Sequence, residues 1–462
     1  MHAYGVKEIM LKYRYVGLAF APFVILCVYI LKYASDLPAY DQWFFALTLE
    51  KFYDGSLTFL DLWSQHNEHR ILFPRLIMLT LARMTHWNIY YELAANLLLG
   101  IGICAVIFQQ IRRTEKYFNI RSNSAYFIAS LFLFSLAQAE NWLWGWQLTF
   151  FLNVFAFLLG IYFLSAPSLP PRNFLGALAA GVISSYSLAN GLLFWLFGLV
   201  ILAIHPMKND AKTRLLALWL SVATLIFISY LWDFHQNPTH QPSLLFFLNK
   251  PWNFLEYFFA NLGAPFSFGG YRQLIAVGTG SLGVGIYLLL LYITSRLVRK
   301  RQEALLIVVA WLSLATYSIL SAGLMAVGRT GLGVEQALSL RYITISNLFW
   351  MGLFVLGLFL TLEFTKSRSG FWINILRNKI FQVACIIIII LLQIAVAQFP
   401  IRWARMRGEI YATVRSDFQK GYYDELLIKR YVCAKDIRRE ISFLAKHRLA
   451  SFSGAGVLIN KP

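Results

Sequence analysis

The feature that most constrains this fold is a series of apolar runs, each long enough to cross a lipid bilayer. The stretches 274–294 and 381–399 contain hardly a charge, and 58% of all residues are hydrophobic against 14% charged. A helix needs about 20 apolar residues to span the hydrocarbon core, and soluble proteins bury large cores without such runs. The sequence therefore predicts an all-α polytopic membrane protein.

The pattern of apolar runs predicts about 11 transmembrane helices. Residues 1–400 are expected to form the membrane domain, and 401–462 a small basic tail, either a helical appendage that meets lipid phosphates or a solvated segment. Residues 76–91 are expected to be interfacial or to continue the second span. The predicted spans cover approximately residues 15–34, 92–111, 123–139, 148–165, 173–189, 191–205, 214–232, 273–295, 304–325, 345–364 and 380–399.

The distribution of basic residues predicts the orientation. The net charge is +19, and the predicted inside segments hold 19 Lys/Arg against 7 in the longer outside loops. Such a bias places the N-terminus in the cytoplasm, and an odd number of spans then leaves the C-terminus outside. The charge is thus explained by topology and by membrane lipids, and no nucleic-acid partner is predicted. The first span is expected to remain uncleaved, because it lacks a small-residue cleavage site.

The loop that follows the first span is the main candidate site. Residues 36–75 hold six carboxylates, two histidines and Arg70 within an otherwise apolar chain. Apolar residues recur at helical spacing in the same loop, which predicts short helices at the membrane interface. Asp41, between Tyr40 and Trp43, would there meet a lipid headgroup and a soluble acceptor together. The alternative is a carboxylate that only caps a helix.

Two motifs invite a cofactor interpretation that the sequence does not support. His66 and His69 in HNEH lack the second ligand pair of structural zinc sites. Hydrogen bonding or substrate contact is therefore favoured, and no metal or other cofactor is predicted. GTGSLG at 278–283 matches a dinucleotide pattern, but it lies inside an apolar run, where small residues favour close helix packing.

Two further outside loops carry candidate binding residues. Arg329 and Arg341, with Tyr342 beside the second, either form a phosphate clamp or only extend toward the interface. In the loop 138–147, three polar side chains among tryptophans are suited to sugar hydroxyls, while an aromatic belt is the alternative for the tryptophans. These three are Glu140, Asn141 and Gln147.

The chain resembles the GT-C fold glycosyltransferases over about residues 10–400. The likeness rests on the long acidic loop after the first span and on the motifs YDQW, HNEHR, AENWLWGWQ, ANGLLFW and GR followed by LRY. It implies a GT-C-like architecture and a bacterial inner-membrane enzyme. Such an enzyme transfers a sugar from a polyprenyl-phosphate donor to an envelope glycan, lipid or protein on the outer face.

The resemblance also implies roles for residues. Asp41 maps onto the catalytic base or acceptor-orienting residue, with Asp36 as a weaker candidate. Many members have a second acidic residue where this chain has Gln42, so Glu68 is expected to supply the second carboxylate. His66, His69 and Arg70 are expected at the acceptor or sugar. A flippase for lipid-linked saccharides and an O-antigen ligase or polymerase remain the alternatives.

Overall fold

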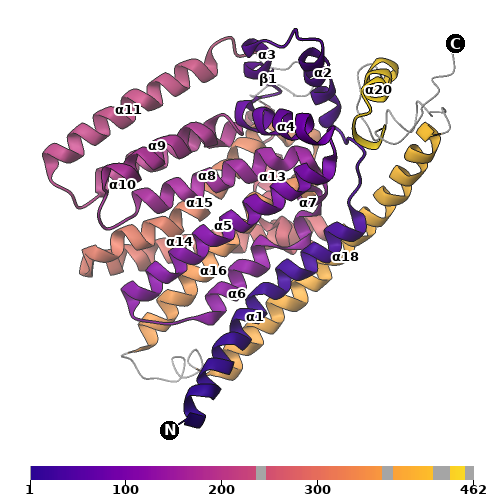
Figure 1. Cartoon of the computed structure of the whole chain (residues 1–462). Coiled ribbons are helices and arrows are strands. Elements are labelled where there is room, and N and C mark those ends of the chain that lie inside the picture. The colour runs from indigo at the N-terminus through magenta and orange to yellow at the C-terminus, as the bar shows by residue number, and fades with distance from the viewer. Residues whose placement is uncertain (1, 236–245, 367–377, 420–436, 453–462) are drawn as a thin grey trace.

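The protein is almost entirely helical in a computed structural model that describes residues 2–235, 246–366, 378–419 and 437–452. Short 3-10 turns and one two-stranded hairpin connect the helices (Figure 1). The described helices are α1 (His2–Tyr33), α2 (Gln42–Tyr53), α3 (Phe59–Trp63), α4 (Leu72–Thr85), α5 (Ile89–Phe118), α6 (Asn123–Leu133), α7 (Ala139–Leu143), α8 (Leu148–Leu164), α9 (Pro171–Ser185), α10 (Leu193–Ile204), α11 (Asn209–Leu231), α12 (Phe246–Asn249), α13 (Pro251–Gly263), α14 (Arg272–Lys300), α15 (Leu305–Arg329), α16 (Ile343–Lys366), α18 (Lys379–Gln419) and α20 (Ile437–Lys446).

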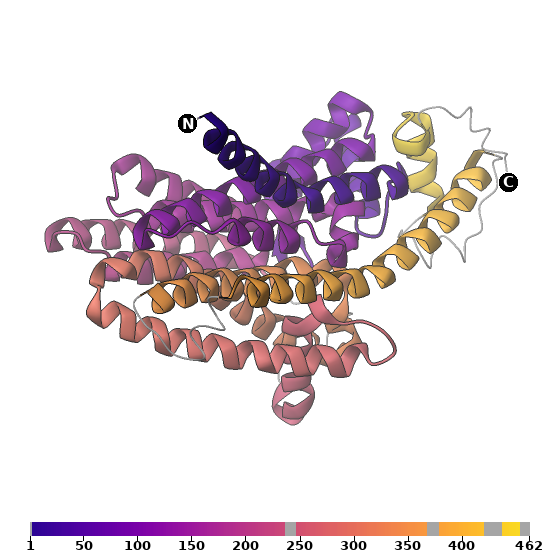
Figure 2. The same cartoon turned by 90° about the horizontal axis from the view of Figure 1, so that it is seen from below.

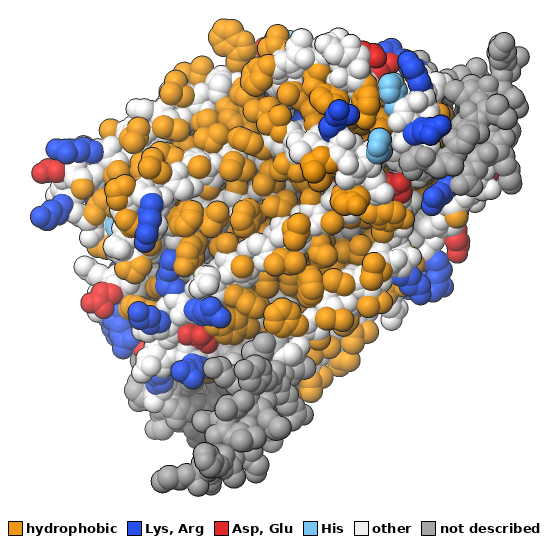
Figure 3. Space-filling view, in the orientation of Figure 1, with side chains coloured by type: hydrophobic (Ala, Val, Ile, Leu, Met, Phe, Trp, Pro, Cys, Tyr) orange, Lys and Arg blue, Asp and Glu red, His pale blue; other side chains and the backbone are white. Residues whose placement is uncertain are grey.

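The structure confirms the prediction of an all-α membrane protein, but it does not confirm the predicted number of about 11 spans. In the described part of the chain, 7 helical segments are long and apolar enough to cross a membrane. The predicted spans at 123–139, 173–189 and 191–205 correspond to α6, α9 and α10, with only 11, 15 and 12 residues. Figure 3 shows a broad apolar face with most charged side chains near its two ends.

The helices assemble into one bundle in which α1 and α18, from opposite parts of the sequence, come into contact. α1 and α18 cross where the Tyr29 hydroxyl donates a hydrogen bond to the Pro400 carbonyl at 3.0 Å, and they diverge toward the N-terminus of α1 (Figure 2). α18 continues through Pro400 to Gln419. The predicted domain boundary at residue 400 therefore falls inside a helix.

The bundle centre is held by side chains that bond to the backbone of neighbouring helices. From α16, the Asn347 amide donates to the Phe132 carbonyl at 2.9 Å and the Trp350 indole donates to the Leu262 carbonyl at 2.8 Å. Such bonds are valuable where lipid removes the hydrophobic driving force between helices. Gly280 of the GTGSLG motif lies against the Phe259 carbonyl, where a Cβ atom would collide. Close packing of α13 and α14 thus explains the motif.

Residues 36–85 cover one end of the bundle, away from the N-terminus (Figure 1). α3 begins with a capping box in which Thr58 and Asp61 exchange hydrogen bonds. α2 buries Trp43, Phe45 and Leu49 in a second hydrophobic core, which also contains residues of α4, α5 and α20. The predicted interfacial segment at 76–91 is divided between α4 and the start of α5. This end of the bundle carries the candidate site.

Candidate functional site

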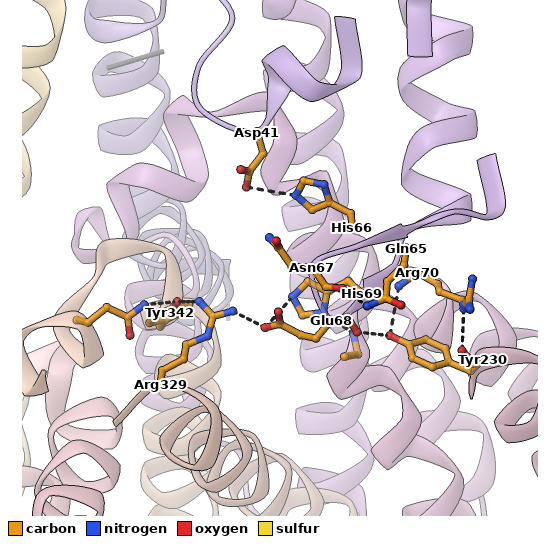
Figure 4. Close-up of polar contacts among 12 residues, drawn as sticks. Asp41, Gln65, His66, Asn67, Glu68, His69, Arg70, Tyr230, Arg329 and Tyr342 are labelled. Atoms are coloured by element: carbon orange, nitrogen blue, oxygen red, sulfur yellow. Dashed lines mark hydrogen bonds and ion pairs between the residues drawn. The ribbon is translucent and has the colours of Figure 1, made fainter. Parts of the chain in front are cut away.

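A two-residue turn aims the histidines and Glu68 of HNEH in fixed directions. Strands β1 (Gln65–His66) and β2 (His69–Arg70) pair antiparallel, with His66 opposite His69. Asn67 occupies the left-handed region with φ 50°, which asparagine tolerates better than most residues. Tight hairpins of this kind fix the register of their strands. The turn therefore presents Glu68 toward α15 (Figure 4).

Arg70 anchors the hairpin. Its Nε donates to the Tyr230 carbonyl at 2.7 Å, Nη1 donates to the Trp63 carbonyl at 3.0 Å, and Nη2 donates to the Trp232 carbonyl. A buried guanidinium with these partners satisfies the carbonyls at the end of α11. The sequence predicted Arg70 at the acceptor or sugar; the structure gives it this anchoring role and does not place it on the walls of the cavity beside the hairpin.

A cavity of about 270 Å³ lies beside the hairpin and collects most of the predicted site residues. Its walls come from the loop that follows α1, from the turn before α8, and from the segment between α15 and α16. The residues that sequence reasoning placed at the site and that line this cavity are Asp41, His66, Glu68, His69, Gln147, Arg329, Arg341 and Tyr342. Segments far apart in the chain thus converge on one cavity.

Asp41 directs its carboxylate toward the cavity. It occupies the N-cap position of α2 but, in the described structure, makes no side-chain capping bond, so the capping alternative does not account for it. Its Oδ2 lies 3.7 Å from His66 Nε2. Burial acts to raise the pKa of Asp41, but the contact with His66 and the nearby Arg341 charge outweigh burial and lower this pKa. Asp41 is therefore ionised at neutral pH.

Glu68 is held by Arg329. The guanidinium donates to Glu68 Oε1 and, at 2.6 Å, to the Tyr342 hydroxyl. Burial would raise the pKa of Glu68, but His69 and Arg329 outweigh it and hold this pKa at about 2. A carboxylate paired in this way is a weak base, so the arrangement suits an orienting role.

His69 is neutral at physiological pH. Burial lowers its pKa to about 4, and its Nδ1 accepts a hydrogen bond from the Ala189 N–H at 3.2 Å. The remaining proton must then be on Nε2, which lies 3.6 Å from Glu68 Oε1. His69 therefore directs an N–H toward Glu68, and Arg329 is the positive charge that keeps Glu68 ionised.

Arg341 is the more available of the two arginines. Its Nη1 lies 4.0 Å from Glu140 Oε1, which is a long contact. Within the described part of the chain, Arg341 Nε, Gln147 Oε1 and His66 Nε2 are buried without a hydrogen-bond partner. Buried polar groups are normally satisfied, and all three residues line the cavity. A ligand with both acceptor and donor groups would satisfy these atoms.

Glu140 and Asn141 lie outside the cavity. The Asn141 amide donates to the Arg341 carbonyl at 2.8 Å and to Thr344 Oγ1 at 2.5 Å, so it fixes the backbone that carries Arg341. Glu140 lines a separate cavity of about 670 Å³ together with Glu256, Arg272 and Glu335. Among the described residues, Glu140 is linked to the charged cavity by its long contact with Arg341.

A more apolar cavity adjoins the charged one. It measures about 450 Å³ and includes Phe150, Leu188, Phe234, Leu324 and Met325 among its walls. Five polar residues at the boundary line both cavities, and they are Asn67, Glu68, His69, Arg329 and Tyr342. A charged chamber and an apolar chamber on either side of one ion pair are suited to an amphiphilic ligand.

Asp36, the weaker catalytic candidate, has a structural role. Its Oδ1 accepts a hydrogen bond from the Ile89 N–H at 2.6 Å, at the start of α5. It does not line the charged cavity. Burial raises its pKa to about 6, against the lowering effect of the Ile89 bond.

This raised pKa predicts a pH dependence of stability. A carboxyl with a higher pKa in the folded protein favours folding most below its unfolded pKa, and that contribution is lost as pH rises toward 6. Asp36→Asn keeps an acceptor for Ile89 and removes the charge. It should therefore melt no lower than the wild type at pH 7.5, with a gain of up to about 3 kcal/mol. Melting temperatures of both proteins in detergent from pH 4 to 8 check this; a large loss in Asp36→Asn at pH 7.5 would contradict it.

Sequence reasoning missed Gln336. Its Nε2 donates to the Tyr342 hydroxyl at 2.9 Å, its Oε1 accepts from the Tyr257 hydroxyl, and it lines the charged cavity. The one signal was an amide beside Glu335 in the short segment 334–340. Gln336 and Arg329 therefore both donate to the Tyr342 hydroxyl and orient it.

The fold and the cavity together define an all-helical membrane protein with a charged site at one end of its bundle. Among the described residues, no three His, Cys, Asp or Glu side chains come together as metal ligands. Comparisons with family models, curated proteins and solved structures find no match for the chain. The chemistry of the cavity therefore carries the functional argument.

Proposed function

We propose that the protein is a membrane glycosyltransferase that moves a sugar from a polyprenyl-phosphate donor to a cell-envelope acceptor. In this proposal the architecture is GT-C-like, and α1 together with the shorter helices α6, α9 and α10 completes about 11 spans. The site faces the outside of a bacterial inner membrane, with the N-terminus cytoplasmic and the C-terminus periplasmic.

One observation carries the proposal: an ionised carboxylate and two guanidinium groups line the same cavity. Asp41, Arg329 and Arg341 come from segments nearly 300 residues apart and face a space of about 270 Å³. The buried Arg341 Nε, unpartnered among the described residues, is a donor available for a phosphate oxygen. A carboxylate opposite a phosphate-binding arginine is the minimum that transfer from a phosphate leaving group requires.

The step follows from these groups. Asp41 takes the proton of the acceptor hydroxyl as that oxygen forms a bond to the anomeric carbon of the sugar. The bond between this carbon and the phosphate oxygen breaks, and its electrons remain on the polyprenyl phosphate. Arg341 stabilises this anion, so the leaving group needs no proton. Attack opposite the leaving group inverts the anomeric configuration.

The adjoining apolar cavity supports a lipid donor. A polyprenyl phosphate keeps its charged head out of hydrocarbon, because burying the charge would be costly. With the phosphate at Arg341, the first isoprene units would extend past Tyr342 and Arg329 into the cavity lined by Phe150, Leu324 and Met325. The test of the proposed function is sugar transfer from such a donor by the purified protein.

His66 provides a pH-dependent test of the base. Its contact with Asp41 lowers the pKa of that carboxylate, so His66→Ala should raise the pKa of Asp41. The acid limb of the kcat/KM profile should then move to higher pH, because a higher pH is needed to ionise the base. His66→Gln retains a donor without a charge and should show a smaller shift. An unmoved acid limb in both variants would remove Asp41 as the ionising group.

A further inference from the structure

The C-terminal segment of residues 437–452 packs onto α2. α20 carries Ile441, Phe443 and Leu444 on its buried face. These side chains belong to the second hydrophobic core, which includes Trp43, Phe45 and Leu49 of α2. Figure 1 shows α20 beside α2 at the site end of the bundle. This part of the segment expected to be either a helical appendage or a solvated tail therefore contributes a packed helix.

Polar contacts from the same segment fall on both sides of Asp41 in the chain. On one side, the Ser451 N–H donates to the Asp36 carbonyl at 3.0 Å, and the Ser451 hydroxyl donates to the same oxygen. On the other side, Arg439 contacts Glu50 near the end of α2, with Nη2 3.0 Å from Oε2 and Nε 3.3 Å from Oε1. The two contacts restrain the loop before Asp41 and the helix after it.

The backbone next to Asp41 requires such restraint. Tyr40 has φ 47°, a left-handed conformation that a bulky residue rarely adopts. Its ring packs edge-on against Trp144 at 5.1 Å between centroids, and Trp144 lines the charged cavity. Backbone strain of this kind persists only where the surroundings over-determine it. The contacts made by residues 437–452 are one part of the surroundings that hold this backbone in place.

We propose that residues 437–452 are a clamp that positions Asp41 in the charged cavity. The clamp residues do not line that cavity, so they act through α2 as positioning residues. The effect of this positioning on catalysis rests on the proposed function. The restraint of α2 by residues 437–452 does not depend on that function. Displacement of a reacting group by about 1 Å can cost about 100-fold in rate.

The test disrupts the clamp in the full-length protein. Phe443→Asp with Leu444→Asp places two charges in the second core, and Lys446→Asp on the exposed side of the same helix is the matched control. Hydrogen exchange of the backbone amides 42–53 should accelerate in the double variant only. In transfer assays, kcat should fall about tenfold or more while the donor KM changes little. The acid limb of kcat/KM should also move to higher pH as Asp41 leaves His66 and Arg341.

A charge exchange provides the milder test. Arg439→Glu and Glu50→Arg each place like charges together, and the combination restores opposite charges in exchanged positions. Each single variant should accelerate exchange at 42–53 and lower kcat, and the combination should recover both. A wild type without transfer activity would refute the proposed function, and the exchange data would still decide the clamp. The clamp would be overturned if hydrogen exchange at 42–53 were unchanged in every disrupted variant. It would also be overturned if exchange became faster while kcat and the acid limb of kcat/KM stayed unchanged.

Discussion

Asp41→Asn is expected to fold normally and to lose transfer by roughly 10²- to 10⁴-fold, the usual contribution of a general base. Asparagine cannot take the acceptor proton, but it fits the N-cap position of α2 equally well. The side chain makes no capping bond in the described structure, so little stability should be lost. Initial rates with saturating donor, together with the melting temperature, measure the two effects separately.

Asp54→Asn is the control for this substitution. Asp54 lies at the other end of α2 and is exposed, so its amide variant makes the same chemical change outside the cavity. Wild-type rates are expected for it. If Asp41→Asn turns over at a near-normal rate, Asp41 is not the base and the mechanism proposed here is wrong.

Arg341→Ala and Arg341→Lys should both reduce transfer strongly. If the guanidinium binds the donor phosphate through a planar pair of N–H groups, lysine cannot replace it, because an ammonium is a point charge without that fork. The loss of a hydrogen bond to a charged group costs about 1.5 to 3 kcal/mol, which corresponds to roughly 10- to 100-fold in kcat/KM. Steady-state kinetics with varied donor concentration give this value.

Two further arginines serve as comparisons for Arg341. Arg301→Lys changes an ion pair with Glu363 at the C-terminal end of α14. Transfer kinetics should be unchanged in this variant. Arg329→Lys should have a mixed effect, because Arg329 also orients Glu68 and Tyr342. Wild-type kinetics in Arg341→Lys would exclude the phosphate fork at Arg341 and leave Arg329 as the remaining candidate.

Hydropathy predicted the membrane-spanning class because the period and length of apolar runs depend on local sequence alone. Span number was harder to predict. The apolar residues 123–139 predicted a single helix. In the structure, α6 ends at Leu133 and is followed by a 3-10 turn and α7. There the buried amide of Gln138 donates to the Leu133 carbonyl. Specific side-chain contacts of this kind accompany helix ends and are not visible in a hydropathy pattern.

The site was predictable to the level of loops. Charged residues concentrated in the predicted outside loops of an apolar chain pointed to Asp41, Glu68, Arg329 and Arg341, which line one cavity. The sequence did not reveal the direction of each side chain. Arg70 bonds to backbone carbonyls, while Arg341, which looked equivalent by composition, borders the cavity. Docking of α20 on α2 was also missed, because contact between distant segments leaves no local signal.

Sugar transfer by the purified protein tests the central claim most directly. Wild type and Asp41→Asn would be compared in detergent, with polyprenyl-phosphate donors carrying different radiolabelled sugars and with cell-envelope extract as the acceptor source. The account predicts that label leaves the donor lipid for an envelope product with wild type, for at least one sugar, and that Asp41→Asn leaves it on the donor. Label that stays on every donor with wild-type protein, or that moves equally with both proteins, would contradict it.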